Sequence, residues 1–205
     1  MGIAGRFLAF GFLVATCSVA YGASGTRTET ATLGERPFQT DLTTIKTVRL
    51  RLHDGDFRIV GSDSDDITIQ TNGKNQPLSK KMKVHLERTG DSLSITFSHV
   101  PKNECQVTIA VPKETNLFAR MRAGDLSVDG VSGDKDLELT GGDMSIQVAD
   151  PADYGPVDLK VKFGDVSGSL FGDPKGWMGS SLKRDGNGRY KLHAHVFAGD
   201  LTLRP

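Results

Sequence analysis

The chain has 205 residues, with 25 basic and 25 acidic side chains and a formal net charge of zero. This balance argues against a nucleic-acid-binding protein, which would carry a basic patch, and against strong electrostatic docking on anionic lipid. The 24 glycines, the 7% of aromatic residues and the lack of a long 3.6-residue period favour a turn-rich, all-β protein. The length suits one domain once the N-terminus is set aside.

Residues 1–22 have the features of a signal peptide. Arg6 supplies a short positive region, and the apolar run at residues 7–15 is too short to span a bilayer comfortably. Ala20 and Gly22 are small residues at positions that a signal peptidase reads, so we expect cleavage after Gly22, with Ala20 as the alternative. The mature chain is therefore expected to be exported, periplasmic or extracellular, and to contain no transmembrane segment.

A lipoprotein is the alternative at this end of the chain, because residues 14–17 end in Cys17 and partly match a lipobox. Thr16 is a poor residue directly before a lipidated cysteine, so the cleavable signal is favoured. Removal of the signal leaves Cys105 as the only cysteine, which excludes an internal disulfide.

Residues 23–44 are rich in Thr and Gly and poor in apolar residues, which predicts a flexible lead-in or a loose first strand. The folded domain is expected to cover residues 45–205. Its first half shows the period-two alternation of half-buried strands. These strands are expected at residues 47–52, 57–59, 67–69, 84–86, 93–97 and 107–111.

The stretch at residues 120–148 organises the rest of the chain. A Gly-Asp pair recurs there every nine residues, and short alternating strands lie between the pairs. The repeat holds the pairs Gly124-Asp125, Gly133-Asp134 and Gly142-Asp143, and echoes of it lie at Gly55-Asp56, Gly164-Asp165 and Gly199-Asp200. Glycine adopts positive φ without penalty, and the aspartate can accept backbone N–H groups that close a turn. Each pair is therefore interpreted as a structural turn, with positive φ expected at several of the glycines 124, 142, 164 and 199.

A unit of two short strands cannot bury its apolar face alone, but a stack of such units can. The repeat therefore predicts an all-β fold, a β-helix-like stack of short strands joined by Gly-Asp turns. Beyond the repeat, Val157, Leu159, Val161 and Phe163 are expected to point inward, and the last strands are expected at residues 190–196 and 201–203. The longest irregular segment, residues 172–189, holds Trp177, which is interpreted either as a cover over the core or as a contact for a partner.

Two sequence patterns suggest a possible metal site. His193 and His195 lie two apart on a strand and share a face, so they could ligate a metal if a neighbouring strand supplied a third ligand. No third ligand is placed by the sequence, and an exposed polar face is the favoured interpretation. The nine-residue spacing also invites comparison with calcium-binding β-rolls, but their second and fourth glycines are missing here. We therefore predict no metal and no cofactor.

Carboxylates gather at Asp129, Asp134, Asp136 and Glu138, as they do in enzymes built on a β-solenoid, but several sit at turns. No Ser-His-Asp elbow, zinc helix or phosphate loop is present in the sequence. We expect no enzyme activity and no catalytic residue. On a solvated face, Asp129→Asn is expected to change stability by no more than ~0.5 kcal/mol.

The series of phrases at residues 123–148, 163–172 and 198–205 resembles the bacterial putative-adhesin domains of unknown function, also called toastrack domains. The resemblance covers residues 48–203 and implies a β-helix-like stack on an exported or envelope protein, with no catalytic residues to carry over. It implies an exported, non-catalytic binding or structural module at the cell envelope, whose partner is an envelope protein or a polysaccharide. The alternatives are a carbohydrate-active enzyme on a β-solenoid and a periplasmic partner of an envelope-stress signalling system.

Overall fold

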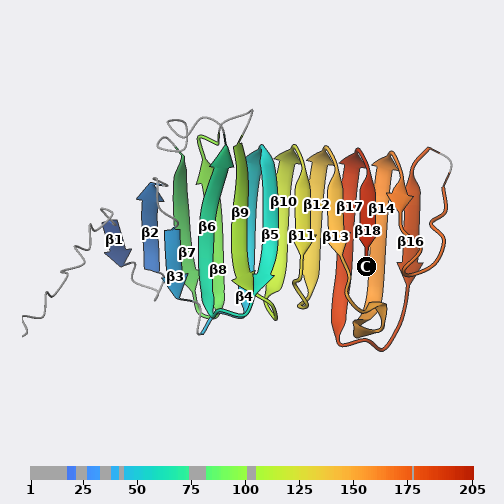
Figure 1. Cartoon of the computed structure of the whole chain (residues 1–205), viewed down its shortest axis with the longest axis horizontal. Coiled ribbons are helices and arrows are strands. Elements are labelled where there is room, and N and C mark those ends of the chain that lie inside the picture. The colour runs from blue at the N-terminus through green and yellow to red at the C-terminus, as the bar shows by residue number, and fades with distance from the viewer. Residues whose placement is uncertain are drawn as a thin grey trace, which may run out of the picture.

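The computed structural model describes residues 18–21, 27–32, 38–41, 44–73, 82–100, 105–176 and 178–205. Over these residues the regular structure is β-strand apart from one 3-10 turn, η1 at Pro151–Asp153. The strands form two sheets that lie face to face along one long axis (Figure 1). The expected all-β stack of short strands is confirmed.

The first sheet has ten strands, and its outward side is called face A below. In spatial order the strands are β1 (Ser18–Tyr21), β2 (Arg27–Thr32), β7 (Lys83–Thr89), β8 (Ser92–Ser98), β4 (Thr47–Asp54), β10 (Asn116–Ala123), β12 (Lys135–Gly141), β17 (Tyr190–Ala198), β14 (Tyr154–Phe163) and β16 (Ser180–Arg184). The second sheet has eight strands, and its outward side is called face B. Its order is β15 (Val166–Ser167), β18 (Leu201–Arg204), β13 (Met144–Gln147), β11 (Leu126–Asp129), β5 (Asp56–Ser62), β9 (Cys105–Pro112), β6 (Asp66–Gly73) and β3 (Phe38–Asp41).

The central strands form parallel coils that cross from the first sheet to the second. The crossings join β4 to β5, β10 to β11, β12 to β13, β14 to β15 and β17 to β18, and each crossing is a Gly-Asp turn. Within the repeat, Asp125 and Asp143 occupy equivalent places 18 residues apart. One coil therefore takes two nine-residue phrases, so Gly133 lies on the opposite edge of the stack from Gly124 and Gly142.

The coils do not stack in chain order. The C-terminal coil, β17 and β18, lies between the β12–β13 coil and the β14–β15 coil (Figure 1). β17 is parallel to β12 on one side and to β14 on the other, while β16 closes the far edge by antiparallel pairing with β14. The end of the chain is thus paired on both sides within the stack and does not form an exposed edge.

The segment expected to be a flexible lead-in contributes two of the strands. β2 pairs antiparallel with β7, and β3 pairs antiparallel with β6, so both sheets extend before residue 45. β1 lies inside the predicted signal peptide and pairs only with β2 at the outer edge of its sheet. Cleavage there would leave the remaining pairings in place. Cys17 and Trp177 lie outside the described residues. Among the residues that the structure describes, no helix is long and apolar enough to cross a membrane.

The core lies between the two sheets and follows the predicted alternation. Leu50, Ile59 and Leu137 are among many apolar side chains with at most 1% exposure, and Phe57 packs edge-on against Phe97 with 5.4 Å between ring centroids. The prediction that Phe163 points inward is wrong, because this side chain is 46% exposed. It directly precedes the turn glycine, where the chain leaves the sheet and the opposite sheet no longer covers it. The residues at the equivalent corners are Asp54, Ala123, Gly141 and Ala198, which are small or polar.

Candidate functional site

Five of the six Gly-Asp pairs named above form one edge of the stack. Their glycines have φ between +110° and +134°, which meets the expectation made for residues 124, 142, 164 and 199. At Gly142 an added Cβ would lie 2.2 Å from the carbonyl oxygen of Gly124, far inside van der Waals contact. The edge therefore requires glycine for two reasons, its positive φ and the close approach of successive coils.

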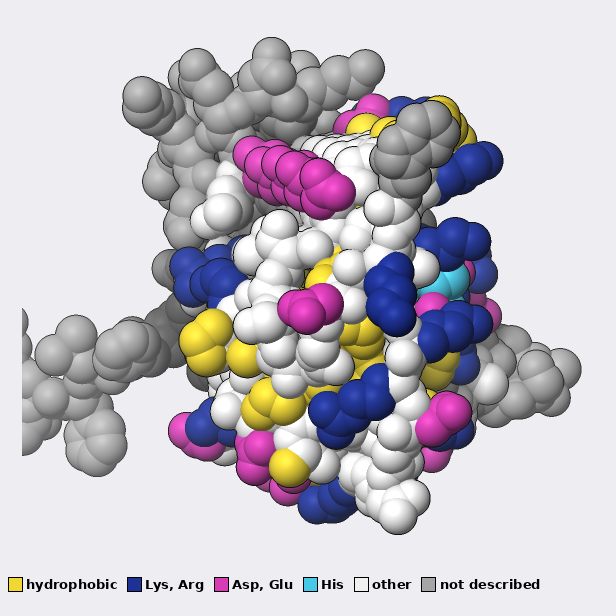
Figure 2. Space-filling view, turned by 90° about the vertical axis from the view of Figure 1, so that its right-hand side faces the viewer, with side chains coloured by type: hydrophobic (Ala, Val, Ile, Leu, Met, Phe, Trp, Pro, Cys, Tyr) yellow, Lys and Arg dark blue, Asp and Glu magenta, His cyan; other side chains and the backbone are white. Residues whose placement is uncertain are grey.

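The aspartates of these turns form a single row, called the acid row. In spatial order it consists of Asp56, Asp125, Asp143, Asp200 and Asp165. Oδ1 of Asp143 accepts the backbone N–H of Asp200, and Oδ1 of Asp200 accepts that of Asp165, each at 2.9 Å. A file of acidic side chains runs along this edge in Figure 2. The row carries five carboxylates, and the bonds show that these aspartates also hold one coil against the next.

The sixth pair, Gly133-Asp134, has a different place and role. Its glycine does not have positive φ, but an added Cβ would lie 2.2 Å from the carbonyl oxygen of Thr115. The N–H of Asp134 donates to Oδ1 of Asn116 at 3.1 Å, and Oδ1 of Asp134 accepts the N–H of Lys191 at 2.9 Å. This pair therefore ties together the starts of β10, β12 and β17.

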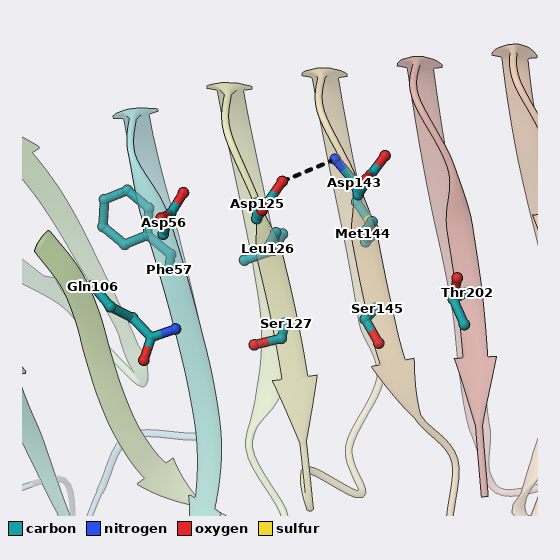
Figure 3. Close-up of a pocket in the computed structure, with 10 residues that line it drawn as sticks. All are labelled: Asp56, Phe57, Gln106, Asp125, Leu126, Ser127, Asp143, Met144, Ser145 and Thr202. Carbon is teal, nitrogen blue, oxygen red and sulfur yellow. Dashed lines mark hydrogen bonds between the residues drawn. The ribbon is translucent and has the colours of Figure 1, made fainter. Parts of the chain in front are cut away.

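On face B the outward side chains of neighbouring strands lie in rows across the sheet, and three of these rows concern the site. The acid row is the first, and the second consists of the short hydroxyl residues Ser127, Ser145, Thr202 and Ser167, continued by Arg58 and Thr108. Because the side chains of Ser127, Ser145 and Thr202 are short, a shallow trough of about 300 Å³ lies over them below the acid row, and Gln106 closes one end (Figure 3). Figure 3 shows the carboxylates above and the hydroxyls below, on neighbouring strands.

The third row contains Asp129 beside Val60, and Gln147 beside Arg204, and the ion pairs of Asp129 hold its charged side chains in place. Asp129 is only 16% exposed at its side chain and accepts Arg58 Nε at 3.0 Å and Arg204 Nη2 at 2.6 Å. Arg204 Nε also donates to Ser145 Oγ at 2.6 Å. The trough therefore has carboxylates along one side and an ordered arginine–aspartate network along the other.

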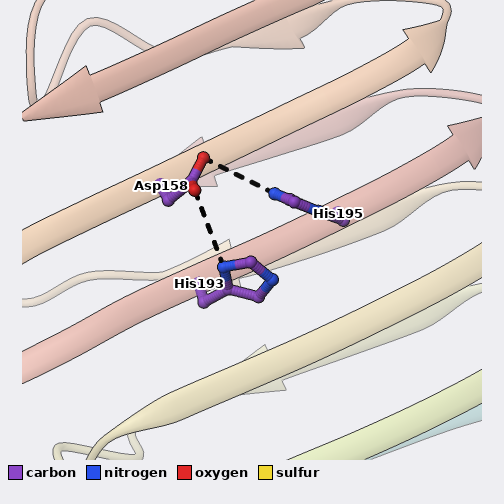
Figure 4. A group of neighbouring side chains, drawn as sticks. All are labelled: Asp158, His193 and His195. Carbon is purple, nitrogen blue, oxygen red and sulfur yellow. Dashed lines mark hydrogen bonds and ion pairs between the residues drawn. The ribbon is translucent and has the colours of Figure 1, made fainter.

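Face A brings the two histidines together with a carboxylate that the sequence did not identify. Asp158 of β14 is the register partner of His193, and its Oδ2 lies 3.9 Å from His193 Nδ1. Its Oδ1 lies 3.5 Å from His195 Nε2, and the two imidazole centroids are 4.0 Å apart (Figure 4). Alternation along residues 157–161 placed Asp158 outward, but only the pairing of β14 with β17 shows which side chains it meets.

The environment shifts the pKa values of this cluster. Partial burial acts to raise the pKa of Asp158, but the hydrogen bonds and charges of His195 and Lys183 bring the pKa below its ordinary value. Burial, and then the neighbouring charge of His193, lower the pKa of His195, although Asp158 opposes the shift. The cluster therefore favours an ionised carboxylate beside a neutral His195. In these protonation states both side chains offer a lone pair that can bind a metal ion.

The four carboxylates that the sequence grouped do not converge. Arg120 pairs with Asp136 Oδ1 and with Glu138 Oε2 on face A, each at 3.0 Å. Asp129 lies on face B, and Asp134 lies at the edge of the stack. A second group, Asp136, Glu138 and His193, shares His193 with the cluster described above.

Lys135 is a buried charge that the sequence analysis did not single out. It is 1% exposed, its Nζ donates to the carbonyl oxygen of Gly133 at 3.2 Å, and it also contacts the hydroxyl of Tyr154. Burial lowers its pKa to about 8, against the charge of Asp134, and burial also raises the pKa of Tyr154. The signal was present in the sequence, because Lys135 has the same parity as the inward Leu137 and Leu139.

Exposed aromatic residues lie on the same sheet as the histidines. Phe163 and Phe197 are 46% and 48% exposed and pack edge to face with 5.5 Å between ring centroids. Lys162 Nζ lies 4.7 Å from the centroid of Phe197. Because the ammonium group lies beside the two rings, this part of face A is both apolar and charged.

Comparison with known proteins supports the fold. No family model and no curated protein matches the chain. A solved structure of a putative cell adhesion protein from Clostridium sporogenes ATCC 15579 shares its fold, with a TM-score of 0.52 and 10% sequence identity. The match covers 82% of this chain and 99% of that chain. The resemblance to putative-adhesin domains is confirmed at the level of the fold.

Proposed function

We propose that the chain is an exported, non-catalytic binding module of the cell envelope, adhesin-like in role, whose face B trough receives an extended polysaccharide. The observation that carries this proposal is the three-row arrangement of face B, with its trough of about 300 Å³ between carboxylates and hydroxyls. Two further points support it: the N-terminal segment resembles a signal peptide, and a solved structure with this fold is that of a putative cell adhesion protein.

The trough suits a sugar chain because its groups repeat along its length. Neighbouring strands are about 4.8 Å apart, so carboxylates and hydroxyls recur at that interval along the stack axis. Carboxylates accept hydrogen bonds from sugar hydroxyls, while Ser127, Ser145 and Thr202 carry groups that both donate and accept. A ligand lying along the trough would meet the same contacts coil after coil.

The placement of carboxylates supports binding over catalysis. A glycosidase needs two carboxyl groups about 5–9.5 Å apart that flank the scissile bond. The acid row lines one side of the trough only, and the carboxylate on the other side, Asp129, is four residues along the strand from Asp125, about 13 Å away. Asp129 is also committed to two arginines.

The test is binding of the exported chain to a panel of envelope polysaccharides, compared with two variants. Ser127→Tyr fills the centre of the trough on face B, and Thr140→Tyr places the same side chain on face A as the matched control. We expect the first variant to lose polysaccharide binding and the second to keep it. Equal binding by both variants, or retention of an envelope protein without any polysaccharide, would overturn the assignment of the trough. Glycoside turnover by the wild-type chain would overturn its non-catalytic character.

A further inference from the structure

We propose that Asp158, His193 and His195 form a binding site for a divalent transition-metal ion, with zinc as the best-matched ion. This replaces the prediction of no metal, because β14 supplies the third ligand that the sequence did not place. The site lies on face A and is independent of the trough on face B. The three side chains come from two adjacent parallel strands, β14 and β17, and point toward one another (Figure 4).

The geometry is close to that of a bound ion. Zinc lies about 2.0–2.2 Å from imidazole nitrogen and carboxylate oxygen, so ligand atoms around a tetrahedral ion are roughly 3.4 Å apart. Here the carboxylate oxygens lie 3.5 Å from His195 Nε2 and 3.9 Å from His193 Nδ1. One ligand atom from each of the three residues lies within 4.8 Å of the others. Small rotations of the side chains would bring all three to bonding distance.

The donor set selects the class of ion. Two imidazole nitrogens and one carboxylate suit zinc, copper and nickel, whereas calcium and magnesium prefer all-oxygen sites. The side chains are about one-third exposed, at 35% for His193 and 33% for His195 and Asp158, so an ion can enter and water can complete its coordination.

The surrounding charges explain why Asp158 is the carboxylate ligand. Asp136 and Glu138 also approach His193, but Arg120 pairs with both at 3.0 Å. The competitor at Asp158 is Lys183, 3.3 Å from Oδ2. The Lys183 side chain is 79% exposed, so it can swing into solvent when an ion replaces it. Metal binding would then connect β14 to β17, where the inserted C-terminal coil meets the coil beside it.

The experiment is calorimetric titration of zinc into the exported chain, purified without a polyhistidine tag and freed of metal with EDTA. We expect one zinc ion per chain. His193→Gln, His195→Gln and Asp158→Asn should each weaken affinity by at least the roughly 10- to 100-fold that loss of an outer-shell partner costs at a metal site. His53→Gln, an exposed histidine on the same face, is the matched control and should leave affinity unchanged. Lys183→Gln should bind zinc at least as tightly as the wild type.

A wild-type measurement keeps the test independent of how well the variants fold. In the NMR spectrum, one equivalent of zinc should shift the ring signals of His193 and His195 and leave those of His53 unchanged. Zinc affinity that survives loss of either histidine, or ring signals that do not respond, would overturn the site.

Discussion

Face A and face B are built on the same coils but carry different outward side chains. Face A bears long charged residues that pair across strands, such as Arg120 with Asp136 and Glu138, and Arg122 with Asp54. Face B bears a row of short hydroxyl residues between the acid row and the Asp129 network. As a result the hollow of about 300 Å³ on face B is lined by carboxylates and short hydroxyl residues, whereas a hollow of about 310 Å³ on face A is lined by long charged side chains, among them Arg51, Arg120 and Glu138.

The backbone repeat therefore does not determine what the surface can bind. Inward positions are constrained by the shared core and by the glycine edge, while outward positions can be long or short without disturbing either. Substitutions at the shared glycine edge, in the core and on each face test how far the two faces differ.

The largest effect is expected where the two faces join. Gly142→Ala places a Cβ 2.2 Å from the carbonyl of Gly124 at φ +116°, so we expect a loss of about 3 kcal/mol or more in the free energy of unfolding. Gly172→Ala is the matched control, because Gly172 has the same φ but no atom within 4 Å of the added Cβ. It should cost only about 1–2 kcal/mol. Urea unfolding measures both, and equal losses would show that close approach of the coils is unimportant.

The next effect lies between the faces, at Lys135. Its pKa in the folded protein is about 8, below the ordinary 10.5, so above pH 8 the folded state loses the proton first and the unfolded state binds more protons. Stability should therefore rise between pH 8 and 10, by about 2 kcal/mol. Above pH 10 the raised pKa of Tyr154 acts in the opposite direction, because the unfolded state then loses its tyrosine proton first. Chemical unfolding across this range should show the rise in the wild type and no rise in Lys135→Met.

A smaller effect distinguishes the ion pairs of the two faces. Asp129→Asn on face B deprives both Arg58 and Arg204 of their shared charge partner, so we expect a cost of about 1 kcal/mol. This replaces the expectation of ~0.5 kcal/mol made for a solvated carboxylate. Glu138→Gln on face A should cost no more than about 0.5 kcal/mol, since Arg120 keeps Asp136. Thermal unfolding compares the two, and a larger loss at Glu138 would reverse the ranking.

The smallest effect is expected for calcium at the acid row. Asp143 and Asp200 already accept backbone N–H groups of the next coil, so adding calcium to EDTA-treated protein should leave the melting temperature nearly unchanged. An ion present at 100 times its dissociation constant would stabilise the fold by about 2.7 kcal/mol. Magnesium at equal ionic strength controls for screening of the row. Stabilisation of that size by calcium alone would identify the aspartates as ligands.

The parts of the fold that follow from local chemistry could be predicted from the sequence. Alternation assigned Leu126, Val128 and Leu139 to the core, because side chains in a strand point to opposite faces in turn. The turns at Gly124 and Gly142 were also predictable, because their conformation depends on φ at one residue and on the aspartate that follows. The inward Lys135 follows from the same alternation but was not recognised.

The choice of neighbouring strands could not be predicted from the sequence. Nothing local in residues 190–198 indicates that β17 inserts between β12 and β14, since pairing depends on how distant strands fit together. That insertion places Asp158 beside His193 and His195, and so creates the histidine cluster. It is likewise the stacking of coils that lines up Ser127, Ser145 and Thr202 into one trough, and the corner position of Phe163 that exposes it. Most inward and outward positions could be predicted from the sequence, because side-chain direction is a property of one strand. Contacts between strands are properties of the assembled stack, and the structure alone decided them.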